Sequence, residues 1–204
     1  MKRNRLLLLS LISSLLVILV SLFQWDLIDI ITEFLMLPIW LFVYAFFIIM
    51  TIWTLIHLLK NRKWQPFVIQ LITISLWFLF PFNQINLDLN FRIHQDKREE
   101  VATKIENGVI KPNVPNSPSL IQLPKEYTQL SKEYTQLSKG GGDIVVETKG
   151  KAKSILFFTY RGMIDNFSGF VYNPNDNKPS KSDFNGDFKQ IKKVHKNWYY
   201  VSSY

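Results

Sequence analysis

The residues best suited to binding lie in a short segment, 161–169, which joins two predicted strands. Arg161, Asp165 and Asn166 place a guanidinium, a carboxylate and an amide near one end of the expected sheet. Binding groups often lie on loops that a rigid scaffold holds in place. These three residues are therefore the candidate binding loop. The favoured interpretation of the segment is a tight connection in which Arg161 and Asp165 pair with each other.

Other reactive residues are too scattered to predict a catalytic or metal site. His57, His94 and His195 are far apart in the sequence, and the chain has no cysteine, so no pair offers metal-ligand spacing. The run 140–142 consists of glycines but lacks the Lys-Ser/Thr of a phosphate-binding loop, and it is typical of a helix end. The sequence therefore predicts no catalytic residue, no cofactor and no metal.

The acid-rich segment 181–187 resembles a calcium-binding loop in spacing. Lys181 occupies the first ligand position and Lys192 the twelfth, where calcium requires an acid. We therefore expect an exposed turn there instead of a calcium site.

Three long uncharged stretches must be placed before these segments can be positioned. No Asp, Glu, Lys or Arg occurs in 6–25, 34–59 or 64–87. Each stretch can hold a helix of roughly 17 to 25 residues, the length that crosses about 30 Å of hydrocarbon. The first stretch is long for a signal peptide and lacks small residues for cleavage, so we expect a retained helix. The sequence therefore predicts a membrane anchor, residues 1–83, with three transmembrane α-helices near 6–23, 35–58 and 66–82.

The distribution of basic residues predicts the orientation of this anchor. Lysine and arginine cluster at 2–5 and again at 60–63, whereas the charged residues in 26–33 are all acidic. Cytoplasmic loops are enriched in cations, so both basic clusters should face the cytoplasm. An odd number of spans then delivers everything after residue 83 to the other side. We expect a multi-pass cell-membrane protein with a cytoplasmic N-terminus and an extracytoplasmic C-terminal domain.

Residues 84–204 are expected to fold as a small α+β domain, without disulfides, that is long enough to have its own core. Alternating apolar residues predict a short strand at 83–90, and Asp96 is the predicted N-cap of a helix over 96–108. Prolines make 111–119 an extended connector. The remaining sequence predicts an antiparallel sheet of four or five strands, with strands at 143–148, 154–160 and 167–172, a turn-rich loop at 173–187 and a closing hairpin in 184–204, for which a helix is the alternative.

The segment 125–138 consists of two consecutive copies of the seven-residue sequence KEYTQLS. As a helix it would align Tyr127, Leu130, Tyr134 and Leu137 in one apolar stripe. A seven-residue insertion turns that stripe by only about 20°. Two identical copies are too few for a repeat fold or a coiled coil. We therefore interpret them as a recent duplication that lengthened a surface helix, with partner-binding heptads as the alternative.

The chain is basic, with a formal net charge of +8, and its main extracytoplasmic cluster of lysines is Lys189, Lys192, Lys193 and Lys196. Scattered surface lysines usually serve solubility. The alternative is attraction to anionic lipid headgroups or to anionic wall polymers. Nucleic acid is an unexpected partner outside the cytoplasm.

Three runs in the C-terminal part carry a resemblance to a known group of proteins. The sequence from LPKEYTQLSK to GGGDIVVE, then ILFFTYRGMIDNFSGFVY, and finally NWYYVSSY resemble the extracytoplasmic domain of uncharacterised small bacterial membrane proteins, chiefly from Bacillus-like organisms. The resemblance covers 84–204 and involves one copy of the YTQLS-like word. It implies a single domain and a recent duplication, and no activity or catalytic residue.

These observations favour a membrane-anchored module for binding, sensing or envelope interaction, and not an enzyme. The expected partners are the lipid bilayer and another envelope or membrane protein, with any small-molecule ligand unknown. One alternative is an immunity-type protein that protects its own cell from a toxin. The other is an envelope hydrolase, which would need an acid and base pair that the sequence does not identify.

Overall fold

The computed structural model describes residues 2–31, 33–124, 137–139, 141–150, 152–162 and 166–204. The chain divides into two compact units, Met1–Leu87 and Asp88–Tyr204. We call them the helical unit and the sheet domain. The boundary between them falls slightly after the predicted one at residue 83.

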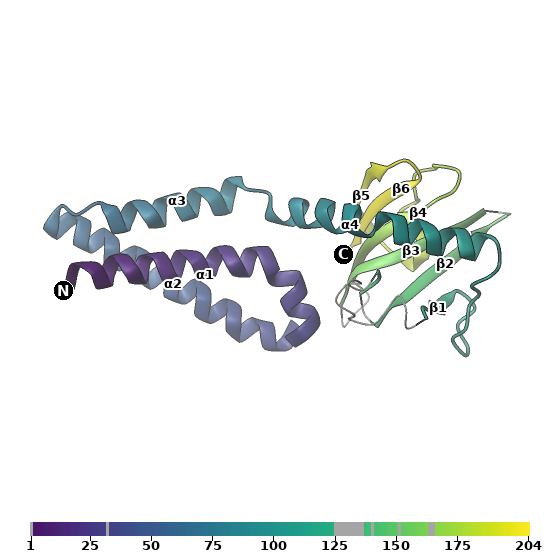
Figure 1. Cartoon of the computed structure of the whole chain (residues 1–204), viewed down its shortest axis with the longest axis horizontal. Helices are drawn as coiled ribbons and strands as arrows, with labels where there is room; N and C mark the ends of the chain where they lie inside the picture. Colours follow the sequence, from purple (N-terminus) through teal and green to yellow (C-terminus); the bar gives the residue numbers. More distant parts are fainter. Residues whose placement is uncertain (1, 32, 125–136, 140, 151, 163–165) are drawn as a thin grey trace. The chain divides into compact units, whose positions relative to one another are not determined.

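The helical unit contains α1 (Lys2–Ile31), α2 (Glu33–Asn61), α3 (Gln65–Leu79) and the first residues of α4 (Phe82–Glu106) (Figure 1). Pro66 lies in the first turn of α3, where its missing N–H costs nothing. Phe80 is extended and Pro81 follows it, which separates α3 from α4. In the described residues, Arg5–Gln24 and Phe34–Asn61 are long and apolar enough to cross a membrane. A third candidate span consists of α3 and α4 together, with a bend of 58° between them.

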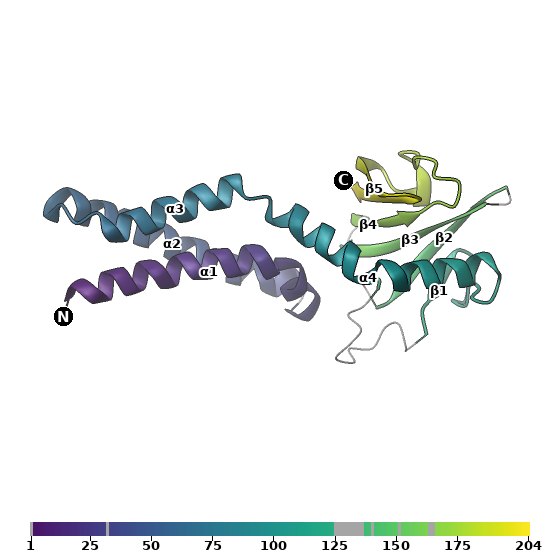
Figure 2. The same cartoon turned by 45° about the horizontal axis from the view of Figure 1, so that its top comes forward.

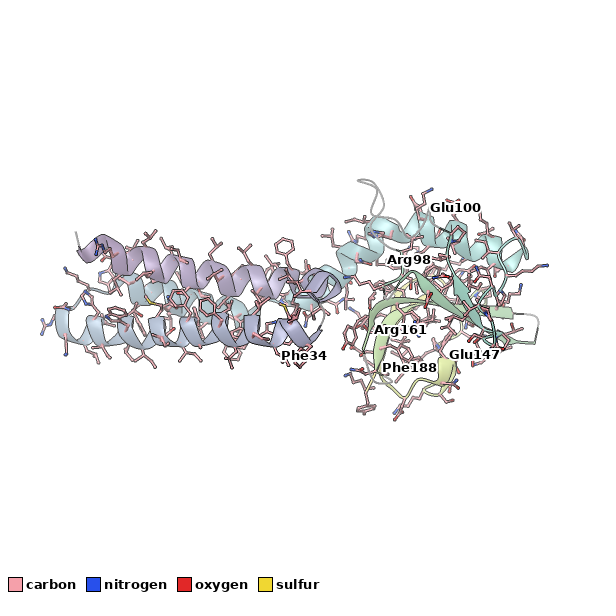
Figure 3. All side chains as sticks on the ribbon, turned by 90° about the horizontal axis from the view of Figure 1, so that it is seen from below. Phe34, Arg98, Glu100, Glu147, Arg161 and Phe188 are labelled. Carbon is pink, nitrogen blue, oxygen red and sulfur yellow. The ribbon has the colours of Figure 1, made fainter. Side chains whose placement is uncertain are left out.

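The polarity of the helical unit is inverted relative to that of a water-soluble protein. Leu41, Phe78 and Leu79 are 76%, 74% and 83% exposed, and Phe34 also lies on the outer surface (Figure 3). Gln70, by contrast, is fully buried. Further hydroxyl side chains of this unit are also buried: Ser10, Ser13, Ser14, Ser21, Thr54 and Thr73.

Hydrogen bonds to α1 determine the direction of the segment from Gln70 to Asn86, which belongs to the third candidate span. Gln70 Nε2 donates to Ser10 O (3.1 Å) and to Ser13 Oγ (3.0 Å). Further along, Asn86 Nδ2 donates to Leu22 O, and Gln24 Nε2 donates to Asn83 Oδ1 (2.6 Å). Residue numbers therefore rise in the same direction along both segments. The segment from Gln70 to Asn86 is parallel to α1 and accompanies it from Ser10 to Gln24.

Residues 83–90 are helical, so the predicted strand there is wrong. They belong to α4, which is continuous from Phe82 to Glu106 and does not begin at Asp96. Three alternating apolar residues are too few to separate a strand from a helix, and Pro81 before the segment favours a helix start. The helical period decides which side chains of α4 are buried: Phe91, His94, Arg98, Val101, Ala102 and Ile105.

In the described residues, the sheet domain has one antiparallel sheet of six strands in the order β1-β2-β3-β4-β6-β5 (Figures 1 and 2). The predicted strands at 143–148, 154–160 and 167–172, and the closing hairpin, are confirmed. The prediction missed β1, a short edge strand that follows the proline connector. The strands are β1 (Leu120–Gln122), β2 (Asp143–Lys149), β3 (Ala152–Arg161), β4 (Phe167–Tyr172), β5 (Phe188–His195) and β6 (Trp198–Ser203).

Each face of the sheet has its own cover. On the helix-side face, Phe91 of α4 packs against Phe170 and Trp198, with ring centroids 5.1 and 5.5 Å apart. The opposite, loop-side face is covered by the segment around the short helix η1 (Asp183–Asn185), whose Phe184 joins a cluster with Leu156, Phe158, Val171, Phe188 and Val201. Both faces of β3 are therefore buried, as the apolar run in its sequence predicts.

The second predicted helix of this domain, over the doubled segment 125–138, falls almost entirely outside the described residues. Its flanks are described. Leu123 N donates to Gly142 O (3.2 Å), and Ser138 is fully buried. Ser138 Oγ accepts a hydrogen bond from Phe158 N (2.8 Å) on β3. The two ends of the segment are thus attached to the sheet domain.

Candidate functional site

The predicted binding loop is only partly within the described residues. Arg161 ends β3, and its Nη1 lies 2.9 Å from Asp143 Oδ2 at the start of β2. Gly162 N donates to Asn166 O (2.8 Å), and the Asn166 side chain lies directly over Gly162. Asp165 lies outside the described residues. The ion pair seen for Arg161 therefore joins β3 to β2.

A different arginine, Arg98, is deeply buried beneath the helix. It lies on the side of α4 that faces the sheet, whereas Glu100 points away (Figure 3). Its Nε donates to Leu137 O (3.1 Å), and its Nη1 and Nη2 donate to Asn90 O (3.4 Å) and Asn90 Oδ1 (2.7 Å). The guanidinium carbon is 4.8 Å from the centroid of the Phe170 ring.

No carboxylate in the described part of the chain compensates this charge. Arg98 is 1% exposed, and burial lowers its pKa to about 9. Moving a cation from water into a site formed by neutral oxygens and an aromatic ring has a large, unfavourable desolvation free energy. Each hydrogen bond to the buried guanidinium therefore contributes strongly to stability. Arg98 therefore holds α4, the segment at Leu137 and strand β4 together. A sequence signal existed, because Arg98 falls on the apolar stripe of the helix that contains Phe91 and Val101.

Next to Phe170 on the helix-side face lies a cluster of four hydroxyls from three strands. Thr159 Oγ1 and Ser168 Oγ are 2.9 Å apart. Tyr200 stacks obliquely on Phe170, with centroids 5.8 Å apart, and burial raises the pKa of its hydroxyl. Hydrogen bonds with Ser168 and Ser202 partly offset that rise. We call Thr159, Ser168, Tyr200 and Ser202 the hydroxyl cluster.

The hydroxyl cluster opens toward the edge strand β5. Gln190 pairs with Ser202 and Lys192 pairs with Tyr200 across the β5–β6 ladder, so each pair shares one face of the sheet. Thr159 and Ser168 are buried, Tyr200 and Ser202 are partly exposed, and Gln190 and Lys192 are exposed. A polar row therefore runs from the interior to the sheet edge. The sequence analysis missed it because its members come from four strands.

This arrangement is suited to hydrogen bonding and not to proton transfer. Within the described residues, none of the four hydroxyls has a carboxylate or imidazole partner. A serine nucleophile requires an adjacent base, and that base in turn is oriented by a third group. The cluster can instead donate to and accept from a polar ligand, and Lys192 adds a positive charge at its exposed end.

In the acid-rich loop, both oxygens of Asp183 have partners within the protein. Asp183 Oδ1 lies 2.5 Å from Lys149 Nζ, and Asp183 Oδ2 accepts a hydrogen bond from Ser180 N (3.0 Å). The first contact fastens η1 to β2, and the second closes the turn that precedes η1. In the part of the chain that the structure describes, no group of three His, Cys, Asp or Glu residues is arranged to hold a metal ion.

Comparison of the chain with protein-family models, with curated proteins and with solved structures gave no significant match. The function is therefore inferred from the geometry of this chain.

Proposed function

We propose that the helical unit is a three-span membrane anchor and that the sheet domain is an extracytoplasmic module that binds or senses a component of the cell envelope. The inverted polarity of the helical unit carries this proposal. In water, exposed Leu41, Phe42 and Phe78 would be unfavourable, whereas in hydrocarbon they face a solvent that matches them. Polar groups inside a membrane bundle instead bond across helices, as Gln70 does.

The direction of the third segment supports three spans over two. The α3 helix has only 15 residues, which is short for a span. Because the residues from Gln70 to Asn86 run parallel to α1 between the levels of Ser10 and Gln24, the chain continues past the end of α3 across the same depth. If α1 crosses the membrane, this segment crosses with it and in the same direction. Asn83 and Asn86 then lie at the level of Gln24, near the outer end of α1.

The basic clusters support the direction of crossing. Lysine and arginine at 2–5 and 60–63 favour the cytoplasmic side for the start of α1 and for the α2–α3 connection. The sheet domain then follows the third crossing on the opposite side. Its basic surface and hydroxyl cluster are suited to polar or anionic envelope material.

Paired reporters can test this topology in cells. One reporter that is active only in the cytoplasm and one that is active only outside would each be fused after Asn61 and after Tyr204. We expect a cytoplasmic signal at Asn61 and an external signal at Tyr204, with the protein resisting alkaline extraction from membranes. A cytoplasmic signal at Tyr204 would reject the three-span arrangement, and release by alkali would reject the anchor itself.

A further inference from the structure

The edge strand β5 and the turn that follows it carry exposed lysines beside the hydroxyl cluster. We propose that Lys189, Lys192 and Lys196, together with Gln190 and Ser202, bind a linear polyanion that carries phosphate and hydroxyl groups. The cellular source of that polymer, the envelope, rests on the proposed function, whereas the surface chemistry comes from the sheet domain itself.

The three lysines are available for an external anion. All three are exposed, and none forms an ion pair with a carboxylate in the described residues. Their neighbour Lys193 differs, because it lies 2.5 Å from Asp176 Oδ2. Lys189 Nζ lies over the ring of Tyr204, 6.0 Å from the ring centroid. The ring carries no charge, so the positive charge of Lys189 is not compensated there.

The spacing of these charges fits a chain and not a single ion. Strand residues rise by about 3.3 Å each, so Lys189 and Lys192 are roughly 10 Å apart along the sheet edge, and Lys196 follows in the turn after His195. One phosphate can contact only one of the three ammonium groups at a time. A polymer with a charge on each repeating unit can contact them together, and multiple weak contacts then add to its affinity.

The chemistry of the row favours phosphate together with hydroxyls. All three cations are lysines, which act on phosphate as point charges, whereas planar bidentate recognition of carboxylates favours arginine. Gln190 on β5 and Ser202 on β6 lie opposite each other in the ladder. Their side chains supply neutral donors and acceptors for hydroxyl groups of the polymer that lie between its phosphates.

A protein strand is a poorer occupant of the same edge. The β5–β6 ladder shifts register between Phe188 and Gln190 and again between Lys193 and His195. Such irregularities and edge lysines are the features that oppose pairing with a further strand. The edge therefore presents charge without offering a regular strand template.

The test is direct binding of fluorescent poly(glycerol phosphate) to the full-length protein in phosphatidylcholine nanodiscs, followed by anisotropy. The triple variant Lys189→Gln, Lys192→Gln, Lys196→Gln should bind at least about tenfold more weakly. The matched control Lys63→Gln, Lys111→Gln, Lys178→Gln removes the same charge from exposed positions elsewhere and should change the affinity less than about twofold. The double variant Gln190→Ala, Ser202→Ala should weaken binding roughly threefold. Hydrogen exchange of β5 and β6 checks that each variant is folded.

Four outcomes would overturn the proposal. They are full affinity in the triple variant, equal loss in the control, equal binding of a single-stranded oligonucleotide of the same charge, and binding of phosphatidylglycerol vesicles without binding of the polymer. The last result would assign the lysines to a lipid surface. Failure of the topology test, by contrast, would reject only the extracytoplasmic source, since the nanodisc assay measures binding regardless of the side.

Discussion

At the residue scale, the energetics of the sheet domain centre on Arg98. Its guanidinium has left water without meeting a carboxylate in the described residues, and three neutral oxygens and the Phe170 ring replace its hydration. Removal of this side chain takes the guanidinium donors away from Asn90 Oδ1 and Leu137 O and leaves space above Phe170. The burial that makes the charge costly therefore also makes its loss costly.

We expect Arg98→Ala to lower the free energy of unfolding of the sheet domain by about 3 kcal/mol. Hydrogen exchange of β3 and β4 peptides in the full chain measures this as roughly a hundredfold faster exchange. Arg92→Ala is the matched control on the same helix, because Arg92 is exposed. An Arg98→Ala protein that exchanges as slowly as the Arg92→Ala protein would show that the buried contacts are energetically neutral.

At the element scale, the second copy of the KEYTQLS heptad lengthens a segment whose two ends are attached to the sheet domain. Leu123 N bonds to Gly142 O, and Ser138 bonds to β3 through Phe158 N. Because the copies are identical, deletion of 132–138 puts Leu130 and Ser131 in the places of Leu137 and Ser138. The attached flank is thus preserved in sequence when one copy is lost.

Deletion of residues 132–138 should leave the stability of the sheet domain almost unchanged. The shorter segment reduces the entropic cost of closure by about 0.4 kcal/mol, which is close to the limit of measurement. Ser138→Ala is the informative comparison, because it removes the acceptor of Phe158 N and should cost about 1 to 2 kcal/mol. Both are measured by hydrogen exchange of β3. A deletion that destabilises β3 more than Ser138→Ala does would make the second copy part of the fold.

At the scale of the whole molecule, two units follow opposite rules of polarity. The sheet domain buries Phe157, Phe170 and Trp198 and exposes lysines, as a protein in water does. The helical unit exposes large apolar side chains such as Leu41 and Phe78, and it buries Gln70 together with several serine and threonine side chains. Gln70 links α3 to α1 through Ser10 and Ser13, and it accepts a bond from Thr51 of α2 (3.2 Å). One amide therefore joins three helices.

Gln70→Leu should weaken the assembly of the helical unit by about 1 to 2 kcal/mol, since interhelical hydrogen bonds in membranes contribute roughly 1 kcal/mol each. Unfolding in mixed micelles with increasing sodium dodecyl sulfate, followed by protease sensitivity of the α2–α3 connection, measures the change. Gln65→Leu, at the exposed start of α3, is the control. Equal midpoints for the two variants would mean that the Gln70 contacts do not hold the three helices together.

Local sequence patterns determined the parts of this protein that depend on neighbours in the chain. Long uncharged runs predicted α1 and α2 because a helix satisfies its own backbone hydrogen bonds. Runs rich in β-branched and aromatic residues predicted β2, β3, β4 and the closing hairpin. The segment 83–90 was assigned wrongly because a few alternating residues fit two periods, and only the continuity of α4 across it decides between them.

The tertiary structure decided which side chains act together. Arg161 pairs with Asp143, which lies 18 positions earlier in the chain, and Arg98 bonds to Leu137, which lies 39 positions later. The hydroxyl cluster and the lysine row become neighbours only because β6 lies between β4 and β5 in the sheet. Strand order and register depend on the burial of two faces at once, which is a property of the folded domain and not of any single segment.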